Sequence, residues 1–243
     1  RAKDIDCLIA PSRYYADRMI ECLGVPADRM RVIYNGINLE GYEPTDYISK
    51  PPVLGFFSRM CRDKGLDAVV DAFITLKKSN RIPNLKLRIG GGCGPGDEPF
   101  VNKLRDRLHA KALLGDVDFH QNLSRLEKQE FLRSLSVLTV PAQFGESFGF
   151  YVIEAMAAGV PVVQPHCASF PELIKATGGG ITYEPTDRET LAATLEKFLY
   201  NLEEARKLGQ AGREVVHEKF SIDIMAQKVG SLFNEISLAK TSG

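Results

Sequence analysis

Two glutamates, Glu146 and Glu154, stand on either side of the Phe148-Gly149 pair and are eight positions apart. If a helix begins near Gly149, its first amides face the ligand side, with Glu146 just before the helix and Glu154 within it. Carboxylates accept hydrogen bonds from hydroxyl groups strongly, so one glutamate could contact a sugar and the other a ribose. An exposed helix edge would explain Glu154 without function, because a buried carboxylate is costly unless it has a partner.

Two cations precede this motif, in the segment 58–65 that follows the apolar run 53–57. Arg59 offers a planar fork of hydrogen-bond donors and Lys64 a point charge. A helix beginning nearby would add free amides and a favourable dipole. The combination suits a diphosphate, although a charged, solvated loop would have the same composition.

Glycines crowd the segment 90–96, which we expect to lie outside helix and strand. Glycine takes positive φ and lets the backbone approach a ligand closely. The segment lacks the Lys-Ser/Thr ending of a P-loop and does not open the first βα unit, as a dinucleotide fingerprint should. By itself it is more typical of a flexible turn than of a site.

Composition excludes several classes of protein. The 31 Lys and Arg residues balance 31 Asp and Glu residues, so nothing favours nucleic acid as a partner and anion binding must be local. The longest apolar run, 148–163, is broken by Glu154, Gly159 and Pro161, which argues against a membrane span. Five cysteines without metal-binding spacing suggest reduced thiols in a cytoplasmic protein, and no bound metal is expected.

Short apolar runs alternate with segments of helical period, a pattern that predicts α/β structure with a doubly wound, Rossmann-like parallel sheet. Strands are expected at 7–10, 30–34, 53–57, 85–89, 117–120, 135–140, 161–163 and 180–183. Helices are expected at 14–23, 66–78, 99–112, 125–132, 149–158, 171–175 and 188–199, followed by a charged helical tail from 203. Ligands of such sheets bind beyond the carboxyl ends of the strands, where the loops with the candidate residues lie.

Proline and glycine in the segment 40–52 indicate a linker with a boundary near residue 50. We therefore expect a connecting strand-helix-strand unit with its linker at 1–50 and the main ligand-binding domain at 51–220. Residues 221–243 would form a helical tail that packs back on an N-terminal domain. The chain begins with neither methionine nor a signal peptide, which suggests a fragment.

Eight elements in this order resemble the C-terminal domain of family 4 glycosyltransferases with the GT-B fold, and the resemblance covers nearly the whole chain. They are Ala10-Pro11-Ser12, Tyr34-Asn35-Gly36-Ile37-Asn38, Ser58-Arg59 with Lys64-Gly65, Gly90-Gly91-Gly92, Pro141-Ala142 with Glu146-Ser147-Phe148-Gly149, the run from Glu154-Ala155 to Pro161-Val162-Val163, Pro171-Glu172 and Gly178-Gly179-Gly180.

The resemblance implies retaining transfer of a sugar from a nucleoside diphosphate sugar, UDP- or GDP-linked, without cofactor or catalytic metal. Arg59, Lys64 and Glu146 are implied as catalytic: the cations bind the diphosphate and Glu146 contacts the sugar. Glu154 is implied to hold the ribose, and backbone groups of 121–123 the base. The remaining implied sugar-donor contacts are Ser58, Gly91, Gly92, Asn122, Leu123, Ser147, Phe148, Gly149 and Phe150. A hydroxyl acceptor would bind through an N-terminal domain that this chain lacks.

One segment departs from the family pattern: Ala168-Ser169-Phe170 stands where the family has two glycines, so Phe170 is expected to place bulk where a backbone comes close. His166, in the same region, could act as acid or base or be a plain loop histidine. Two other functions remain open. One is a nucleotide-sugar epimerase or phosphorylase on the same scaffold, and the other is a non-catalytic nucleotide-sugar binding subunit.

Overall fold

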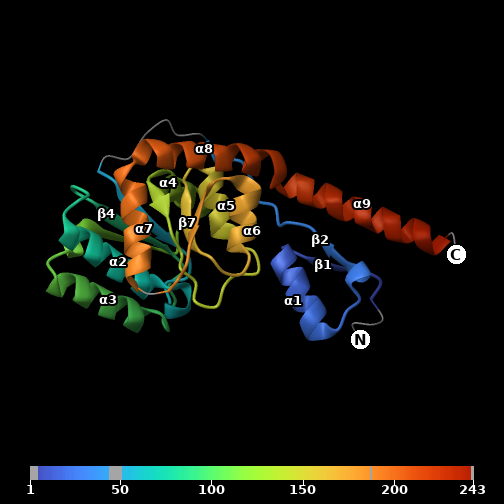
Figure 1. Cartoon of the computed structure of the whole chain (residues 1–243), viewed down its shortest axis with the longest axis horizontal. Helices are drawn as coiled ribbons and strands as arrows, with labels where there is room; N and C mark the ends of the chain where they lie inside the picture. Colours follow the sequence, from blue (N-terminus) through green and yellow to red (C-terminus); the bar gives the residue numbers. More distant parts are fainter. Residues whose placement is uncertain (1–4, 44–50, 187, 242–243) are drawn as a thin grey trace.

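The chain folds into a small strand-helix-strand unit and a large α/β unit, which lie side by side along the longest axis of the computed structural model (Figure 1). The structure describes residues 5–43, 51–186 and 188–241. In the small unit, β1 (Leu8–Ala10) and β2 (Met30–Val32) pair in parallel, and α1 (Arg13–Leu23) connects them. The predicted strand, helix and strand of this segment are all present.

The large unit is built on six parallel strands in the order β5-β4-β3-β6-β7-β8. Strands β3, β4 and β5 follow one another toward one edge of the sheet, and β6, β7 and β8 follow one another toward the opposite edge. The point between β3 and β6 is therefore a topological switch point, where ligands of open α/β sheets bind. The strands are β3 (Val53–Phe57), β4 (Lys86–Gly91), β5 (Val117–Gln121), β6 (Val137–Leu138), β7 (Val162–Pro165) and β8 (Gly180–Tyr183).

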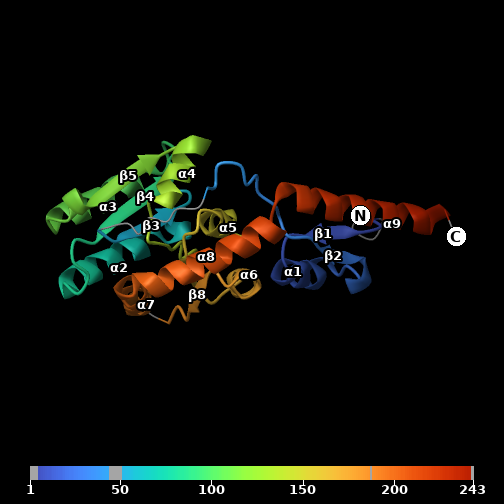
Figure 2. The ribbon, with the colours of Figure 1, turned by 90° about the horizontal axis from the view of Figure 1, so that it is seen from above.

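Helices cover both faces of this sheet, as Figure 2 shows from above. One layer contains α2 (Leu66–Ser79), α3 (Glu98–Ala110) and α7 (Arg188–Tyr200). The other contains α4 (Arg125–Arg133), α5 (Phe150–Ala157), α6 (Phe170–Thr177) and α8 (Leu202–Lys219). Because both faces are covered, β7 is buried at every position and β3 at all but its last, and β3 is a continuous apolar run. The predicted doubly wound parallel sheet is confirmed.

The expectation that the glycine run lies outside regular structure is wrong for its first two residues. Gly90 and Gly91 end β4, paired with Phe57 of β3 and with β5. A Cβ at Gly90 would lie 2.8 Å from the rings of Phe57 and Phe131, so only glycine allows this close packing. Gly91 has φ of 127°, a conformation that side chains rarely adopt. Here the glycines serve the packing of the strand, and the loop begins at Gly92.

The end of the chain returns to the small unit. Helix α9 (Ile222–Thr241) leaves the large unit and runs beside β1 and β2 (Figures 1 and 2). At the crossing, the Ile37 amide donates to the Phe220 carbonyl at 2.9 Å, and the Ile222 amide donates to the Ile37 carbonyl at 3.0 Å. The chain therefore passes between the units twice, once near Ile37 and once at 220–222, and backbone hydrogen bonds join these two segments. The predicted boundary near residue 50 lies outside the described residues.

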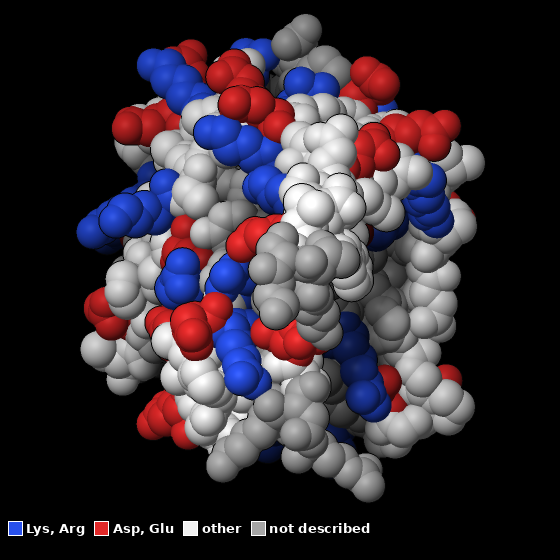
Figure 3. Space-filling model, turned by 90° about the vertical axis from the view of Figure 1, so that its right-hand side faces the viewer, with Lys and Arg blue, Asp and Glu red and all other residues white. Residues whose placement is uncertain are grey.

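The surface of the small unit and α9 carries both signs of charge. Figure 3 shows Lys and Arg side chains interspersed with Asp and Glu on this side of the molecule. Arg31 of β2 and Glu235 of α9 form one such pair, with 3.9 Å between the charged atoms. Within the described residues, no helix combines the length and the hydropathy that crossing a membrane requires.

Candidate active site

The loops after β3 and β6 meet at the switch point of the sheet. Loop 58–65 leaves β3 and ends in a single 3-10 turn, Arg62–Lys64, before α2 begins. Loop 139–149 leaves β6 and leads into α5. The Gln143 amide donates to the Asp63 carbonyl at 3.0 Å, which fixes one loop against the other. The loops that carry the predicted cations and Glu146 are thus joined by their backbones.

Lys64 and Glu146, from these two loops, are in direct contact. The Lys64 ammonium donates to Glu146 Oε1, and the Tyr151 hydroxyl donates to the same oxygen at 3.2 Å. Both charged side chains are largely shielded, with 29% of Lys64 and 17% of Glu146 exposed. Burial, followed by the charge of Glu146, raises the pKa of Tyr151 well above its usual value, so the phenol keeps the proton that it donates. The structure brings together two of the three residues predicted to be catalytic.

Arg59, the third of these residues, contacts a different carboxylate. Its Nε lies 3.1 Å from both oxygens of Asp97, and its Nη2 lies 3.0 Å from Oδ1. Asp97 is buried and also accepts a 3.1 Å hydrogen bond from the Gly94 amide. The bond from Arg59 holds the pKa of Asp97 below its usual value, and the same bond raises the pKa of Arg59. Arg59 is therefore exposed yet anchored.

The sequence analysis missed Asp97. The signal was an acidic residue immediately before a helix, in the loop after the strand that neighbours β3. Because the carboxyl ends of parallel strands share one edge, that position lies close to the Arg59 loop.

Glu154 also has a lysine partner. Lys128 of α4 donates to Glu154 Oε1 at 2.6 Å, and the side chains are 24% and 15% exposed. A carboxylate shielded to this degree requires such a partner, and the sequence analysis did not identify Lys128. The alternative of an exposed helix edge does not describe this position.

The loop after β5 is joined to the glycine-rich loop through Asn122. The Asn122 side chain accepts from the Cys93 amide and donates to the Cys93 carbonyl, both at 3.0 Å. Its own amide donates to the Gly91 carbonyl at 2.8 Å. The Asn122 side chain is thus occupied within the protein, while Leu123 next to it is half-buried. Exposed Gly92 accepts from the Met60 amide at 2.8 Å.

The aromatic residues at the start of α5 divide between core and surface. Gly149 caps the helix with φ of 91°, Phe148 before it is buried, and Phe150 after it is exposed. The ring of Phe148 meets the ring of Phe150 edge-on, with 5.6 Å between centroids. Because the first amides of a helix lack intrahelical acceptors, this end of α5 provides hydrogen-bond donors and a partial positive charge.

Phe170, which is expected to place bulk where a backbone comes close, is turned into the core. Phe170 is fully buried, and its ring lies 6.4 Å from the ring of Tyr151, measured between centroids. The segment turns at Ala168, with φ of 52°, so α6 begins at Phe170 with the ring directed into the core. Phe170, the residue that departs from the family pattern, therefore packs in the core next to Tyr151.

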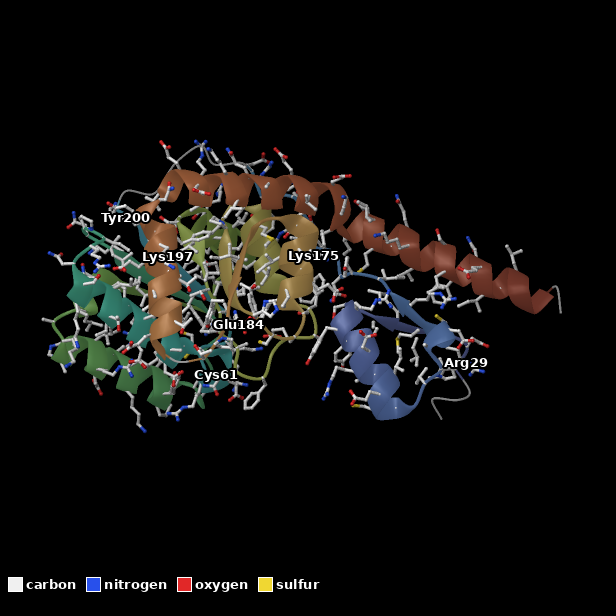
Figure 4. All side chains as sticks on the ribbon, in the orientation of Figure 1. Arg29, Cys61, Lys175, Glu184, Lys197 and Tyr200 are labelled. Atoms are coloured by element: carbon white, nitrogen blue, oxygen red, sulfur yellow. The ribbon has the colours of Figure 1, made fainter. Side chains whose placement is uncertain are left out.

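His166 and the neighbouring loops complete the same edge of the sheet. The Nδ1 atom of His166 lies 2.9 Å from the Thr182 hydroxyl, a contact at the protein surface. Figure 4 shows Cys61, after β3, and Glu184, after β8, at this edge, with Tyr200 at the opposite one. Among the described residues, no group of three or more His, Cys, Asp or Glu side chains is arranged to hold a metal ion.

The small unit contacts the site through the start of α1. The Ser12 hydroxyl, which caps this helix, donates to the carbonyl of Ser147 at 2.6 Å. Glu172 of α6 accepts from the amides of Arg13 at 2.8 Å and Tyr14 at 3.0 Å. It also accepts from the Tyr34 hydroxyl at 2.8 Å. Helix α1 is therefore fixed against the residue that follows Glu146.

Comparison with known families agrees with this arrangement. The family model of glycosyl transferases group 1 matches residues 44–215. The chain belongs to this family. A model of glycosyltransferase family 4 matches residues 1–40, so the two matched ranges meet inside the predicted linker. The part of this glycosyl transferase chain that carries the six-stranded sheet and its loops lies in the group 1 match.

Individual relatives match nearly all of this glycosyl transferase chain. An exopolysaccharide phosphotransferase of Streptomyces coelicolor is 28% identical over 237 residues, which are 97% of this chain and 24% of that protein. Sucrose-phosphate synthase from Thermosynechococcus elongatus shares 25% identity with a TM-score of 0.83, covering 98% of this chain and 60% of its own.

A third relative, the Anabaena protein HepE, was solved in complex with UDP and glucose. It has the same fold, with 21% identity and a TM-score of 0.82, and the match covers 96% of this chain and 64% of its own. The glycosyl transferase chain thus spans less than two thirds of the length of each of the three proteins.

Proposed function

We propose that this chain binds a nucleoside diphosphate sugar and forms the sugar-donor half of a retaining glycosyltransferase. The contact between Lys64 and Glu146 carries the proposal, because it joins a cation to a carboxylate at the switch point of the sheet, and a carboxylate there can accept hydrogen bonds from a sugar. The start of α5 lies on the same loop and would add amides for phosphate or sugar oxygens. Membership of the group 1 family supports glycosyl transfer.

The reaction breaks the bond between the anomeric carbon and the phosphate oxygen and forms a bond to the acceptor oxygen on the same face. Negative charge develops on the departing diphosphate, where Lys64, Arg59 and the α5 amides stabilise it. The departing phosphate oxygen takes the acceptor's proton. This chain therefore does not need to supply a strong general base. Glu146 accepts hydrogen bonds from the transferred sugar.

Glu154 is proposed to hold the ribose. Lys128 binds its Oε1 and orients the carboxylate, which leaves acceptor positions for the two ribose hydroxyls. The base would meet backbone groups beside Asn122 and Leu123, because the Asn122 side chain is already bound to Cys93. UDP is the first nucleotide to test, since HepE was solved with UDP.

The acceptor is proposed to bind mainly to sequence that this chain does not contain. The chain spans 60% of sucrose-phosphate synthase, and only residues 1–40 match the family 4 model. The 243-residue chain alone should therefore bind the sugar donor but transfer sugar poorly. A cytoplasmic location is part of the proposal, because the five cysteines are all unpaired thiols, as in a reducing compartment.

Glu146→Ala in the complete enzyme tests the proposal. We expect sugar transfer to fall while the nucleotide still binds, because Glu146 reads the sugar and the nucleotide has its own contacts. Glu130→Ala, at an exposed position of α4, is the matched control. If Glu146→Ala leaves transfer unchanged, the catalytic assignment fails and a nucleotide-sugar binding subunit is favoured. A product that is an epimer of the supplied sugar would instead indicate an epimerase.

A further inference from the structure

A hollow of about 290 Å³ lies between α1 and residues 144–147, where the small unit meets the site. Tyr14, Tyr15 and Arg18 line it from α1, while Phe144 and Glu146 line it from the loop after β6. Glu146 therefore belongs both to the Lys64 contact and to the wall of this hollow. Nothing in the proposed binding of the sugar donor uses the residues of α1.

Two aromatic side chains are exposed on opposite walls of the hollow. The loop residue Phe144 is 80% exposed, and Tyr14 of α1 is 36% exposed. A single exposed ring needs no explanation, but two that line one hollow, from elements far apart in the sequence, form a shared apolar surface. Such surfaces, with a few polar groups placed beside them, are typical of small-molecule sites.

The walls of the hollow are held in place by hydrogen bonds between α1 and the large unit. Ser12 has no exposed surface and joins residues 135 positions apart through its 2.6 Å bond to the Ser147 carbonyl. Glu172 fixes the start of α1 by accepting from the amides of Arg13 and Tyr14. The positions of Tyr14 and Glu146 relative to one another are thus set before any ligand arrives, which lowers the entropic cost of binding.

The chemistry of the hollow suits a sugar ring. A pyranose has apolar C–H faces, which pack on aromatic rings, and hydroxyl edges, which donate to a carboxylate such as Glu146. Arg18 adds a guanidinium that can donate to ring or substituent oxygens. Because Glu146 also reads the transferred sugar, a ring in the hollow would lie directly beside that sugar.

We propose that this hollow is a subsite for a sugar ring of the acceptor, with Tyr14 and Phe144 as its apolar walls. The proposal rests on the proposed function, since it takes Glu146 as the meeting point of the transferred sugar and the acceptor. It assigns part of acceptor recognition to this chain, through α1 of the small unit, and it makes the acceptor a carbohydrate.

Saturation-transfer difference NMR on the 243-residue chain with a panel of methyl glycosides and saturating UDP tests the proposal. At least one glycoside should give a signal, which falls at least fivefold in Tyr14→Ala and in Phe144→Ala. Phe233→Ala removes an exposed ring on α9, away from the hollow, and should leave the signal unchanged. Calorimetry on the same samples should show UDP binding unaltered in all three variants, and their thermal unfolding should match the parent chain.

Each other outcome overturns the proposal in a distinguishable way. If UDP binds but no glycoside gives a signal, or if the signal survives both hollow variants, the subsite assignment is wrong and the proposed function stands. If UDP-glucose displaces the glycoside where UDP does not, the hollow holds the sugar of the donor instead of the acceptor. If neither the nucleotides nor the glycosides bind, the proposed function itself fails.

Discussion

Arg59 and Lys64 leave the same loop, five positions apart, yet they sit in different electrostatic settings. Arg59 is 66% exposed and is bound by Asp97, a buried carboxylate that the Gly94 amide also holds. Lys64 is less than half as exposed, and its partner Glu146 is itself a candidate for contact with substrate. One ion pair holds a cation in place, whereas the other joins two residues that are both proposed to contact the substrate.

The difference predicts which cation matters more. A charge in a shielded place acts through a lower effective dielectric than one in contact with water, so Lys64 should stabilise the departing diphosphate more strongly than Arg59. Asp97 should matter only through Arg59. The variants below separate the two ion pairs, beginning with the largest expected effect.

Lys64→Ala should reduce turnover by about 10²- to 10³-fold, the range found when one preorganised charge-stabilising group is removed. The loss should appear in kcat more than in the affinity for the nucleotide, since the charge develops as the sugar departs. Steady-state kinetics of the complete enzyme measures it. Lys78→Ala removes an exposed cation on α2; it is the control and should leave turnover unchanged. An equal loss from both substitutions would remove Lys64 from the mechanism.

Arg59→Ala and Asp97→Ala should each weaken binding of the diphosphate by roughly tenfold, the loss expected when one hydrogen bond to a charged group is removed. Asp106→Ala, at an exposed position of α3, should have no effect. The double substitution should cost no more than Arg59→Ala alone, because Asp97 acts through Arg59. Additive losses in the calorimetric Kd would show that Asp97 has a separate role.

Glu154→Gln should weaken nucleotide binding by about tenfold, by the same estimate for a charge-assisted hydrogen bond. The informative readout is the ratio of the Kd values for UDP and 2′-deoxy-UDP. This ratio should be large in the parent chain and close to one in the variant if Glu154 holds the ribose hydroxyls. Glu130→Gln should retain the parent ratio. A ratio that does not change in Glu154→Gln would leave Glu154 with only its contact to Lys128.

Tyr151→Phe should have the smallest effect, a loss in turnover of about threefold to tenfold, because it removes one hydrogen bond and leaves the Lys64 contact of Glu146 in place. Kinetics beside Tyr200→Phe, an exposed position, measures it. If Tyr151→Phe reduced turnover as much as Lys64→Ala, the phenol itself would have to act on the substrate.

The fold was largely predictable because short apolar runs typical of strands alternate along the sequence with segments whose apolar residues recur with the helical period. All eight expected strands are present, and the loops after β3 and β6, which carry the candidate residues, meet at the switch point of the observed strand order. Strand β6 is shorter than expected, since only Val137–Leu138 are assigned to it. The residues flanking β6 still bond to β3, as the Ser136 amide does to the Val53 carbonyl at 2.8 Å.

The partners of the candidate residues could not be predicted. Asp97 and Lys128 lie 38 and 26 positions from the residues that they hold, and no periodic pattern encodes such tertiary contacts. The position of Phe170 shows the same limit. The sequence indicates only that its bulk stands where a backbone normally comes close, whereas the left-handed turn at Ala168 and the burial of the ring are set by neighbours that belong to other elements. The period of apolar residues predicts a helix or strand and its buried face, whereas contacts between side chains of different elements are known only from the folded structure.

Calorimetry of the 243-residue chain against UDP, GDP and ADP sugars tests the central claim most directly. The proposal predicts binding of one of these nucleotides, weakened by Arg59→Ala and by Glu154→Gln but unchanged by Lys78→Ala. Absence of binding to all three classes of nucleotide sugar would contradict it.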